Sequence, residues 1–165
     1  MGRGSGELYG VEHITHAGAT LSKAFCSHGA IVGCSAATAL HLRDLPQIRG
    51  SSAGSSVSAA VGAASLKYVA NHPHLREELT DTTRYFRTLL TGLGVQVPES
   101  PAPIVTFKYG GRNDMEALQR RLWREGIHIY HSSYGGAGPY GVIRAVFRDH
   151  SRADIDRLVS AIKST

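Results

Sequence analysis

The sequence predicts an α/β protein in two parts: an incomplete α/β portion over residues 1–70 and a complete two-layer α+β domain over residues 71–165. Two observations predict this division. The first part contains only two short apolar runs of strand type, which are too few to close a sheet. From residue 95 onward, strand and helix patterns follow one another in the order β-α-β-β-α, which is typical of a small sheet covered by helices.

The first part begins with a glycine-rich stretch. Residues 1–10 contain four glycines and little apolar content, and they therefore predict a loop. The apolar runs 11–17 and 30–34 predict two short strands.

A capped helix, a polar loop and a long helix are expected next. Ser35 can cap a helix over residues 36–42, and residues 44–52, which include Pro46, predict a polar loop. Residues 53–71 are rich in alanine, glycine and serine with apolar residues at helical spacing. They predict a helix that packs closely against other backbone.

The second part alternates clear helix and strand signals. Pro73 suits the first turn of a helix over 74–93, which Gly92 and Gly94 end. The remaining elements are predicted as strands at 95–97 and 104–109, a helix opened by a capping box at 113–116 and ended by Gly126, a strand at 127–131, a glycine-rich loop at 132–141, a strand at 142–147, and a last helix capped by Ser151 to Asp154.

Composition excludes several classes of function. The net charge of +5 is spread along 165 residues, with only Arg120 and Arg121 adjacent, so nucleic-acid binding is disfavoured. Cys26 and Cys34 make neither a disulfide framework nor a zinc set, and no metal site is predicted. No signal segment and no apolar run of membrane-spanning length is visible, which predicts a cytoplasmic protein without a membrane partner.

The stretch with the most chemistry is residues 17–25, where Lys23 follows the hydroxyl residues Thr20 and Ser22. An amine in this setting can form a Schiff base, and the two hydroxyls can hydrogen-bond a phosphate beside it. We expect such an amine to be held still and partly desolvated. Alone the pattern is weak, because a Ser-Lys pair in a loop is more often solvated surface.

Residues 20–25 resemble the pyridoxal-phosphate lysine motif of the α-oxoamine synthases, which are fold-type-I enzymes. The resemblance continues in chain order along the whole sequence. It includes glycine-rich residues 2–4, the serine loop and alanine-rich helix from residue 51, and the arginine-bearing strand 142–147 followed by residues 154–158. An ordered set of this kind is far more specific than any one of its motifs.

The resemblance implies roles for five residues. Lys23 would carry pyridoxal 5'-phosphate and remove the α-proton of the substrate, and Thr20 would hydrogen-bond the cofactor phosphate. Ser51 or Ser52 would reach the phosphate of a neighbouring subunit's cofactor. Arg144 would bind the carboxylate of the amino acid, a task suited to a bidentate guanidinium.

The resemblance also implies a fold and a reaction. Residues 1–70 would be the C-terminal part of a cofactor-binding large domain, and residues 71–165 the small C-terminal α+β domain. The reaction would condense an amino acid with an acyl-CoA or acyl-carrier-protein thioester. The chain would act as a homodimer, or in complex with a full-length or N-terminal partner chain.

Two departures from the family pattern bear on activity. Cys26 stands where the family usually has glycine. The family's Asp-x-Ala-His segment, which holds the ring nitrogen of the cofactor, has no counterpart in residues 1–165. We therefore expect a truncated or split chain that is inactive alone. The alternatives are a class II aminotransferase-like protein and a non-catalytic regulatory or dimerisation subunit.

Overall fold

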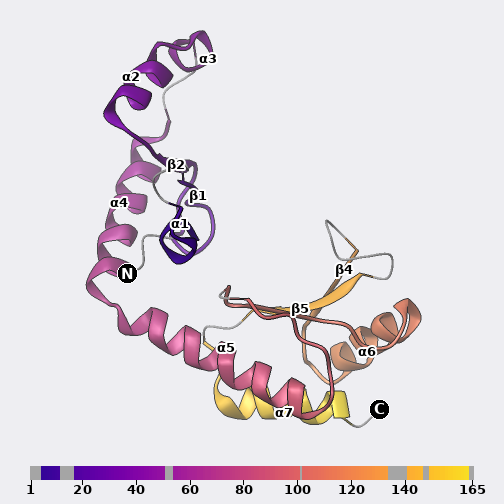
Figure 1. Ribbon diagram of the computed structural model, residues 1–165. Helices are drawn as coiled ribbons and strands as arrows, with labels where there is room; N and C mark the ends of the chain where they lie inside the picture. Colours follow the sequence, from indigo (N-terminus) through magenta and orange to yellow (C-terminus); the bar gives the residue numbers. More distant parts are fainter. Residues whose placement is uncertain are drawn as a thin grey trace. The chain divides into compact units, whose positions relative to one another are not determined.

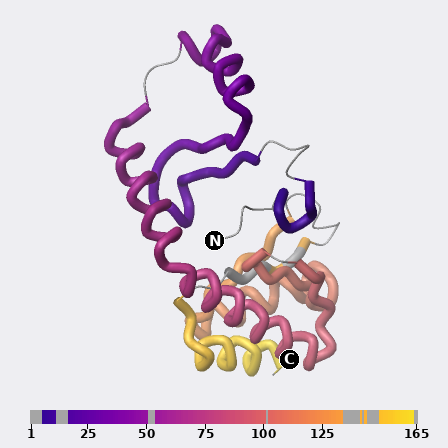
Figure 2. Tube along the Cα trace, turned by 60° about the vertical axis from the view of Figure 1, so that its left-hand side comes forward, coloured from indigo at the N-terminus to yellow at the C-terminus, as the bar shows by residue number. Residues whose placement is uncertain are grey.

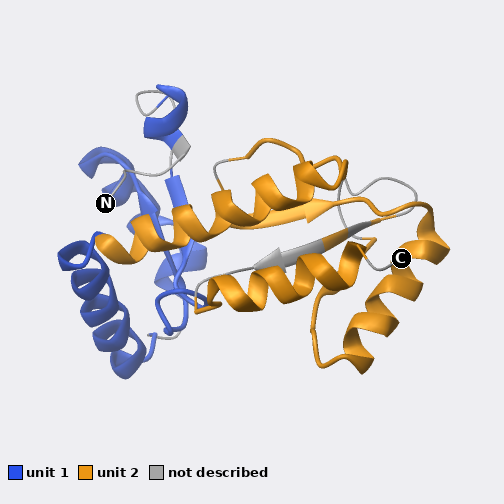
Figure 3. Cartoon of the chain, turned by 90° about the horizontal axis from the view of Figure 1, so that it is seen from below, with its two compact units in different colours: residues 1–73 blue, residues 74–165 orange. Residues whose placement is uncertain are grey.

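The computed structural model describes residues 5–11, 17–50, 54–100, 102–133, 141–146 and 149–163. The chain divides into two compact units, unit 1 over residues 1–73 and unit 2 over residues 74–165, which are coloured separately in Figure 3. Figure 1 labels most of the helices and strands along the chain.

Unit 1 is built around a two-stranded antiparallel ribbon and one long helix. In β1 and β2, Ala17 stands opposite Gly33 and Thr20 opposite Ala30. The elements of unit 1 are α1 (Ser5–Tyr9), β1 (Ala17–Thr20), β2 (Ala30–Gly33), α2 (Ala36–Asp44), α3 (Pro46–Arg49) and α4 (Ser56–Asn71). All eight residues of the two strands are exposed within the chain.

Several predictions for unit 1 are confirmed. The expected strand at 30–34 is β2, and Ser35 caps α2 by accepting a hydrogen bond from the Thr38 amide at 3.1 Å. The expected long helix is α4, which begins at Ser56 because Ser55 is its cap. Most of the strand expected at 11–17 lies outside the described residues.

Two of the loops predicted in unit 1 are wrong. Residues 5–9 form α1 within the stretch that was expected to be a loop. The glycines of that stretch permit many conformations and do not by themselves exclude a single helical turn. Pro46 begins the short helix α3, because its fixed φ angle suits a first helical turn.

Unit 2 is a three-stranded antiparallel sheet with helices that share one core. Its elements are α5 (His74–Gly92), β3 (Ile104–Phe107), α6 (Arg112–Arg124), β4 (Tyr130–Ser132), β5 (Val142–Val146) and α7 (Arg152–Lys163). The strand order is β3-β5-β4, and the β-α-β-β-α order predicted for this region is confirmed. The Tyr85 hydroxyl on α5 donates to Asp156 on α7 at 2.5 Å, and this bond raises the pKa of Tyr85.

The core of unit 2 lies between the helices and one face of the sheet. On β3, Val105 and Phe107 are fully buried, whereas Ile104 and Lys108, the residue after the strand, are exposed. The buried cluster consists of Phe86, Leu90, Val105, Phe107, Met115, Leu118, Leu122, Ile143, Ile155, Leu158, Ala161 and Ile162. Because alternate residues of a strand face opposite sides, the other face of β3 remains open.

Three details of unit 2 differ from the prediction. Residues 95–97 are not a strand, and β4 begins only at Tyr130. The helix α6 is capped at Gly111 instead of Asn113, because the Asp114 carboxylate accepts the Gly111 amide at 2.7 Å. A carboxylate in the first turn thus satisfies the free amide of Gly111, so the cap lies two residues earlier than the sequence pattern suggests.

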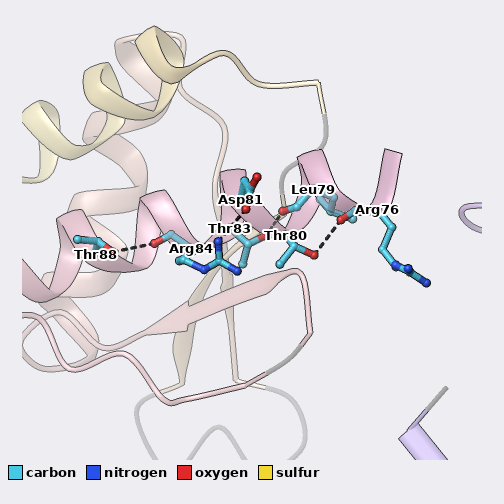
Figure 4. A network of polar contacts seen from close by, with 7 residues as sticks. All are labelled: Arg76, Leu79, Thr80, Asp81, Thr83, Arg84 and Thr88. Atoms are coloured by element: carbon cyan, nitrogen blue, oxygen red, sulfur yellow. Dashed lines mark hydrogen bonds and ion pairs between the residues drawn. The ribbon is translucent and has the colours of Figure 1, made fainter. Parts of the chain in front are cut away.

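The polar side chains on α5 are largely satisfied within the helix, as Figure 4 shows. The hydroxyls of Thr80, Thr83 and Thr88 donate to the carbonyls of Arg76, Leu79 and Arg84 at 2.8, 2.7 and 3.0 Å. Thr83 can therefore be buried without an unmade hydrogen bond. In the described part of the chain, no helix has both the length and the apolar character needed to cross a bilayer.

Candidate active site

The loop that joins β1 to β2, residues 21–29, carries Lys23 and is called the lysine loop. Its ends are tied together by a hydrogen bond of 2.9 Å from the Leu21 amide to the Gly29 carbonyl. A second bond of 2.9 Å runs from the Ser27 amide to the Leu21 carbonyl, and a turn bond of 3.0 Å joins the Cys26 amide to the Lys23 carbonyl. The backbone of Lys23 is therefore fixed at the first position of a tight turn.

The lysine loop is attached to α4, beside which its trace runs in Figure 2. Leu21 is only 8% exposed, and a Cβ on Gly62 would lie 3.2 Å from its Cδ1 atom. The Ser27 hydroxyl donates to the Ser58 carbonyl at 2.5 Å. The small-residue helix predicted from the sequence thus has a defined use, because Gly62 allows the loop to approach closely.

Two hydroxyl residues precede the lysine in sequence, Thr20 by three positions and Ser22 by one. The Oγ1 atom of Thr20 and the Oγ atom of Ser22 are 2.8 Å apart, and the Ser22 amide donates to Thr20 Oγ1 at 3.3 Å. Both residues and Lys23 are exposed within this chain. The structure therefore brings Thr20 and Lys23 onto one short segment, but the expected desolvation of the amine is wrong for the chain by itself.

The electrostatics of this segment favour an anion. From residue 13 to residue 43 the sequence contains no aspartate or glutamate. The hydroxyl pair uses one O–H proton in its own hydrogen bond and keeps the other O–H for a further acceptor. An ammonium and this O–H, with no nearby acidic residue in sequence, form a donor set that suits a phosphate group. These residues therefore fit pyridoxal phosphate, because its aldehyde group reacts with an amine and its phosphate group accepts hydrogen bonds.

Cys26 has a backbone conformation that is unusual for its residue type. Its φ angle is +49°, and it is the one non-glycine residue with positive φ in the described part of the chain. A side chain in this region costs roughly 1–2 kcal/mol relative to ordinary helical backbone. The turn after Lys23 thus requires a conformation in which glycine is favoured, as the resemblance led us to expect at this position.

The three remaining predicted site residues belong to other segments of the chain. Ser51 and Ser52 lie outside the described residues. Arg144 belongs to β5, the central strand of unit 2, where its backbone stands opposite Thr106 on β3 and Tyr130 on β4. Arg144 is therefore in a different unit from Lys23, and the placement of its side chain is outside the description.

Two positioning residues escaped sequence reasoning. Ser27 and Gly62 hold the lysine loop on α4, yet they lie 35 residues apart in the sequence (62 minus 27). The one available signal was the run of small residues in α4, which indicates close packing but not its partner. Among the described residues, no group of three or more histidine, cysteine, aspartate or glutamate side chains is placed to hold a metal ion.

Comparison with known proteins gives consistent matches. Residues 8–162 match the family model for aminotransferase class I and II. The 8-amino-7-oxononanoate synthase of Trichlorobacter lovleyi is 31% identical over 98% of this chain and 43% of its own length. The chain therefore spans less than half the length of this curated relative.

Solved structures share the fold. The 8-amino-7-oxononanoate synthase of Francisella tularensis superposes with a TM-score of 0.83 and 20% identity, over 99% of this chain and 49% of its own. A serine palmitoyltransferase solved with pyridoxal phosphate gives a TM-score of 0.84 and 18% identity, over 98% of this chain and 42% of its own. Both units of the chain thus occur together in longer proteins of known structure.

Proposed function

Because this chain belongs to the aminotransferase class I and II family, we propose that it carries the lysine-bearing part of a pyridoxal-phosphate-dependent acyltransferase of the α-oxoamine synthase type. The proposed reaction condenses an amino acid with an acyl thioester. The observation that carries the proposal is the pairing of the Thr20 and Ser22 hydroxyls at 2.8 Å on the segment that holds Lys23.

Each site residue has a proposed task. Lys23 holds the cofactor through its amine and later takes the α-proton of the amino acid. Thr20, together with Ser22, hydrogen-bonds the cofactor phosphate, and Ser51 or Ser52 serves the phosphate in a neighbouring subunit. When bound, pyridoxal phosphate supplies the electron sink for the pair of electrons left at the α-carbon.

Arg144 is proposed to bind the carboxylate of the amino acid. Its guanidinium is permanently charged and can bind a carboxylate through two parallel hydrogen bonds. The central position of β5 in the sheet supports this role, because a central strand holds its residues in place from both sides. Binding at this point fixes the substrate and leaves its α-proton to Lys23.

We propose that activity requires a further polypeptide portion that completes unit 1. Leu21 is the one large hydrophobic residue buried among the described residues of unit 1, whereas Val57 of α4 is 71% exposed and Val32 of β2 is 57% exposed. Exposed apolar surface of this extent is typical of a face that another structure covers. The proposed complement is the part of the family fold that the relatives carry outside the matched span, in a homodimer or a complex of two chains.

The same exposure also favours a second function. A non-catalytic subunit could use the open ribbon of unit 1 only to associate with a full-length relative. Such a subunit would have no need for the amine of Lys23. Reactivity at Lys23 therefore separates the two functions.

Incubation with pyridoxal phosphate followed by borohydride reduction tests the proposal. The chain has four lysines, and peptide mass spectrometry can follow labelling at Lys23, Lys67, Lys108 and Lys163 separately. We expect Lys23 to be labelled at the lowest cofactor concentration, and Lys23→Ala to remove that high-affinity labelling.

Lys67→Ala is the matched control, because Lys67 is also an exposed lysine of unit 1. This variant should leave labelling at Lys23 unchanged. Equal labelling of all four lysines over the whole concentration range would refute cofactor binding by this chain and would favour the non-catalytic function. If Lys23 is labelled selectively, addition of the complementary portion should increase the selectivity for Lys23 further.

A further inference from the structure

A pocket of about 440 Å³ lies beside β3 in unit 2 and has no role in the proposed reaction so far. Its walls are Gln96, Val97, Pro98, Thr106, Phe107 and Lys108. This volume falls within the range of about 300–1,000 Å³ that small-molecule sites occupy. The pocket therefore has room for a compact organic ligand.

The polar groups of this pocket have unused hydrogen-bonding capacity. Within the described ranges, the side chains of Gln96, Thr106 and Lys108 have no hydrogen-bond or ion-pair partner. Together they offer an ammonium, a hydroxyl and an amide. Thr106 is half-buried, so its hydroxyl is less able than an exposed one to use bulk water as its partner.

The charge and the apolar wall of the pocket indicate the ligand. Lys108 is the one charged residue among the lining residues, and Glu99 does not line the pocket although it follows Pro98 in sequence. An anion is therefore favoured at the Lys108 end. Val97 and Pro98 provide apolar surface suited to a hydrocarbon segment.

We propose that this pocket binds an aliphatic carboxylate, with the carboxylate at Lys108 and Thr106 and the hydrocarbon chain against Val97 and Pro98. The pocket borders the strand position of Arg144, because Thr106 stands directly opposite Arg144 in the antiparallel register. Directly opposite residues have Cα atoms about 4.5–5.5 Å apart. This inference rests on the proposed function, in which the pocket is a specificity subsite for a second carboxylate-bearing group of the substrates.

Such a group has two possible sources, the side chain of the amino acid and the acyl chain of the thioester. L-glutamate represents the first source and octanoate the second. Octan-1-ol keeps the hydrocarbon chain but lacks the charge, and acetate keeps the charge but lacks the chain. Each probe is titrated into the ¹⁵N-labelled 165-residue chain without pyridoxal phosphate, and the amide signals of Gln96, Val97, Thr106 and Lys108 report binding.

We expect octanoate or L-glutamate to shift these signals at lower concentration than octan-1-ol or acetate. Lys108→Gln should weaken the binding of that carboxylate about threefold to fivefold, the upper end of the range for an exposed ion pair. Lys163→Gln is the matched control, since Lys163 is an exposed lysine of α7 in the same unit. It should leave the affinity unchanged.

Three results would overturn the proposal. The first is equal affinity for octanoate and octan-1-ol together with no binding of L-glutamate. The second is an equal loss of carboxylate affinity in Lys108→Gln and Lys163→Gln. The third is a set of shifted signals that does not include the four reporter amides. The titration is independent of Lys23, because the cofactor is left out. Failure of this pocket therefore leaves cofactor labelling at Lys23 untouched, and failure of that labelling leaves the pocket intact.

Discussion

Gly62 on α4 and Leu21 at the start of the lysine loop lie so close that a single added carbon would strain the contact. A Cβ on Gly62 would come within 3.2 Å of Leu21 Cδ1 and within 3.3 Å of Ser27 Oγ. The position of Lys23 thus depends on the absence of a side chain on a helix 39 residues later (62 minus 23).

Gly62→Val should loosen the lysine loop. Overpacking costs about 1–3 kcal/mol, which exceeds the gain of roughly 0.5 kcal/mol in helix propensity. We expect the Leu21 and Ser27 amides to lose hydrogen-exchange protection by about tenfold or more, measured by NMR. Gly92→Val is the control, because nothing lies within 4 Å of a Cβ at Gly92. Unchanged protection in Gly62→Val would contradict the packing described for α4.

Cys26→Gly should stabilise the lysine loop. Glycine adopts the φ angle of +49° found at Cys26 without the steric cost that a side chain carries. The expected gain is about 1 kcal/mol, reduced by the greater freedom of glycine in the unfolded chain. Urea titration monitored through the amide signals of residues 21–29 measures it. Cys34→Gly should have the opposite sign, because Cys34 does not have positive φ. A loss of stability in both variants would refute strain at Cys26.

Thr20→Val should weaken the labelling of Lys23 by pyridoxal phosphate, because it removes a hydroxyl proposed to bind the cofactor phosphate. The variant keeps the shape of Thr20 but removes the hydroxyl that pairs with Ser22 at 2.8 Å. We expect the concentration that half-labels Lys23 to rise about fivefold for pyridoxal phosphate, and to stay unchanged for pyridoxal, which lacks the phosphate. Thr88→Val on α5 controls for loss of a threonine hydroxyl. An equal effect on both aldehydes would show that Thr20 does not serve the phosphate.

Asp154→Asn should make the stability of unit 2 less dependent on acid pH. The Ser151 hydroxyl donates to the Asp154 carboxylate at 2.7 Å and the Ser151 amide does so at 2.9 Å, and these bonds lower the pKa of Asp154. A carboxylate with a lowered pKa stabilises the fold above its ordinary pKa, and this stabilisation is lost as the pH falls through the folded-state value.

The variant should therefore unfold at a lower temperature than the parent at pH 7, and the difference should shrink below the ordinary aspartate pKa of about 3.9. Circular dichroism melting curves from pH 7 down to pH 2 measure it. Glu125→Gln serves as the comparison, because Glu125 is exposed and its side chain makes no described contact. A pH-independent difference for Asp154→Asn would mean that the cap acts without its charge.

Elements with local signals were predictable from the sequence. Ser35 and Ser151 cap their helices through hydrogen bonds to amides three residues later, and such bonds depend only on neighbouring residues. The amphipathic helices α5, α6 and α7 were predicted for a similar reason, since the apolar stripe lies within each helix.

Features that depend on distant residues were not predictable. Residues 95–97 have strand-like composition, but a strand exists only where a neighbouring strand pairs with it. The contact of Gly62 with Leu21 joins two separate segments, and no local pattern specifies that pairing. The exposure of Lys23 likewise depends on what covers unit 1, which the residues around Lys23 do not encode.

The unequal cores of the two units have a consequence for biosynthesis. Unit 1 leaves the ribosome before unit 2, and at about 5–20 residues per second the second unit takes roughly 5–20 s to synthesise. Throughout that interval the nascent chain presents the β1–β2 ribbon without the buried cluster that stabilises unit 2. In those seconds the ribbon can be bound by its structural complement, by a chaperone or by another nascent ribbon. Which of these binds first then decides how much protein matures.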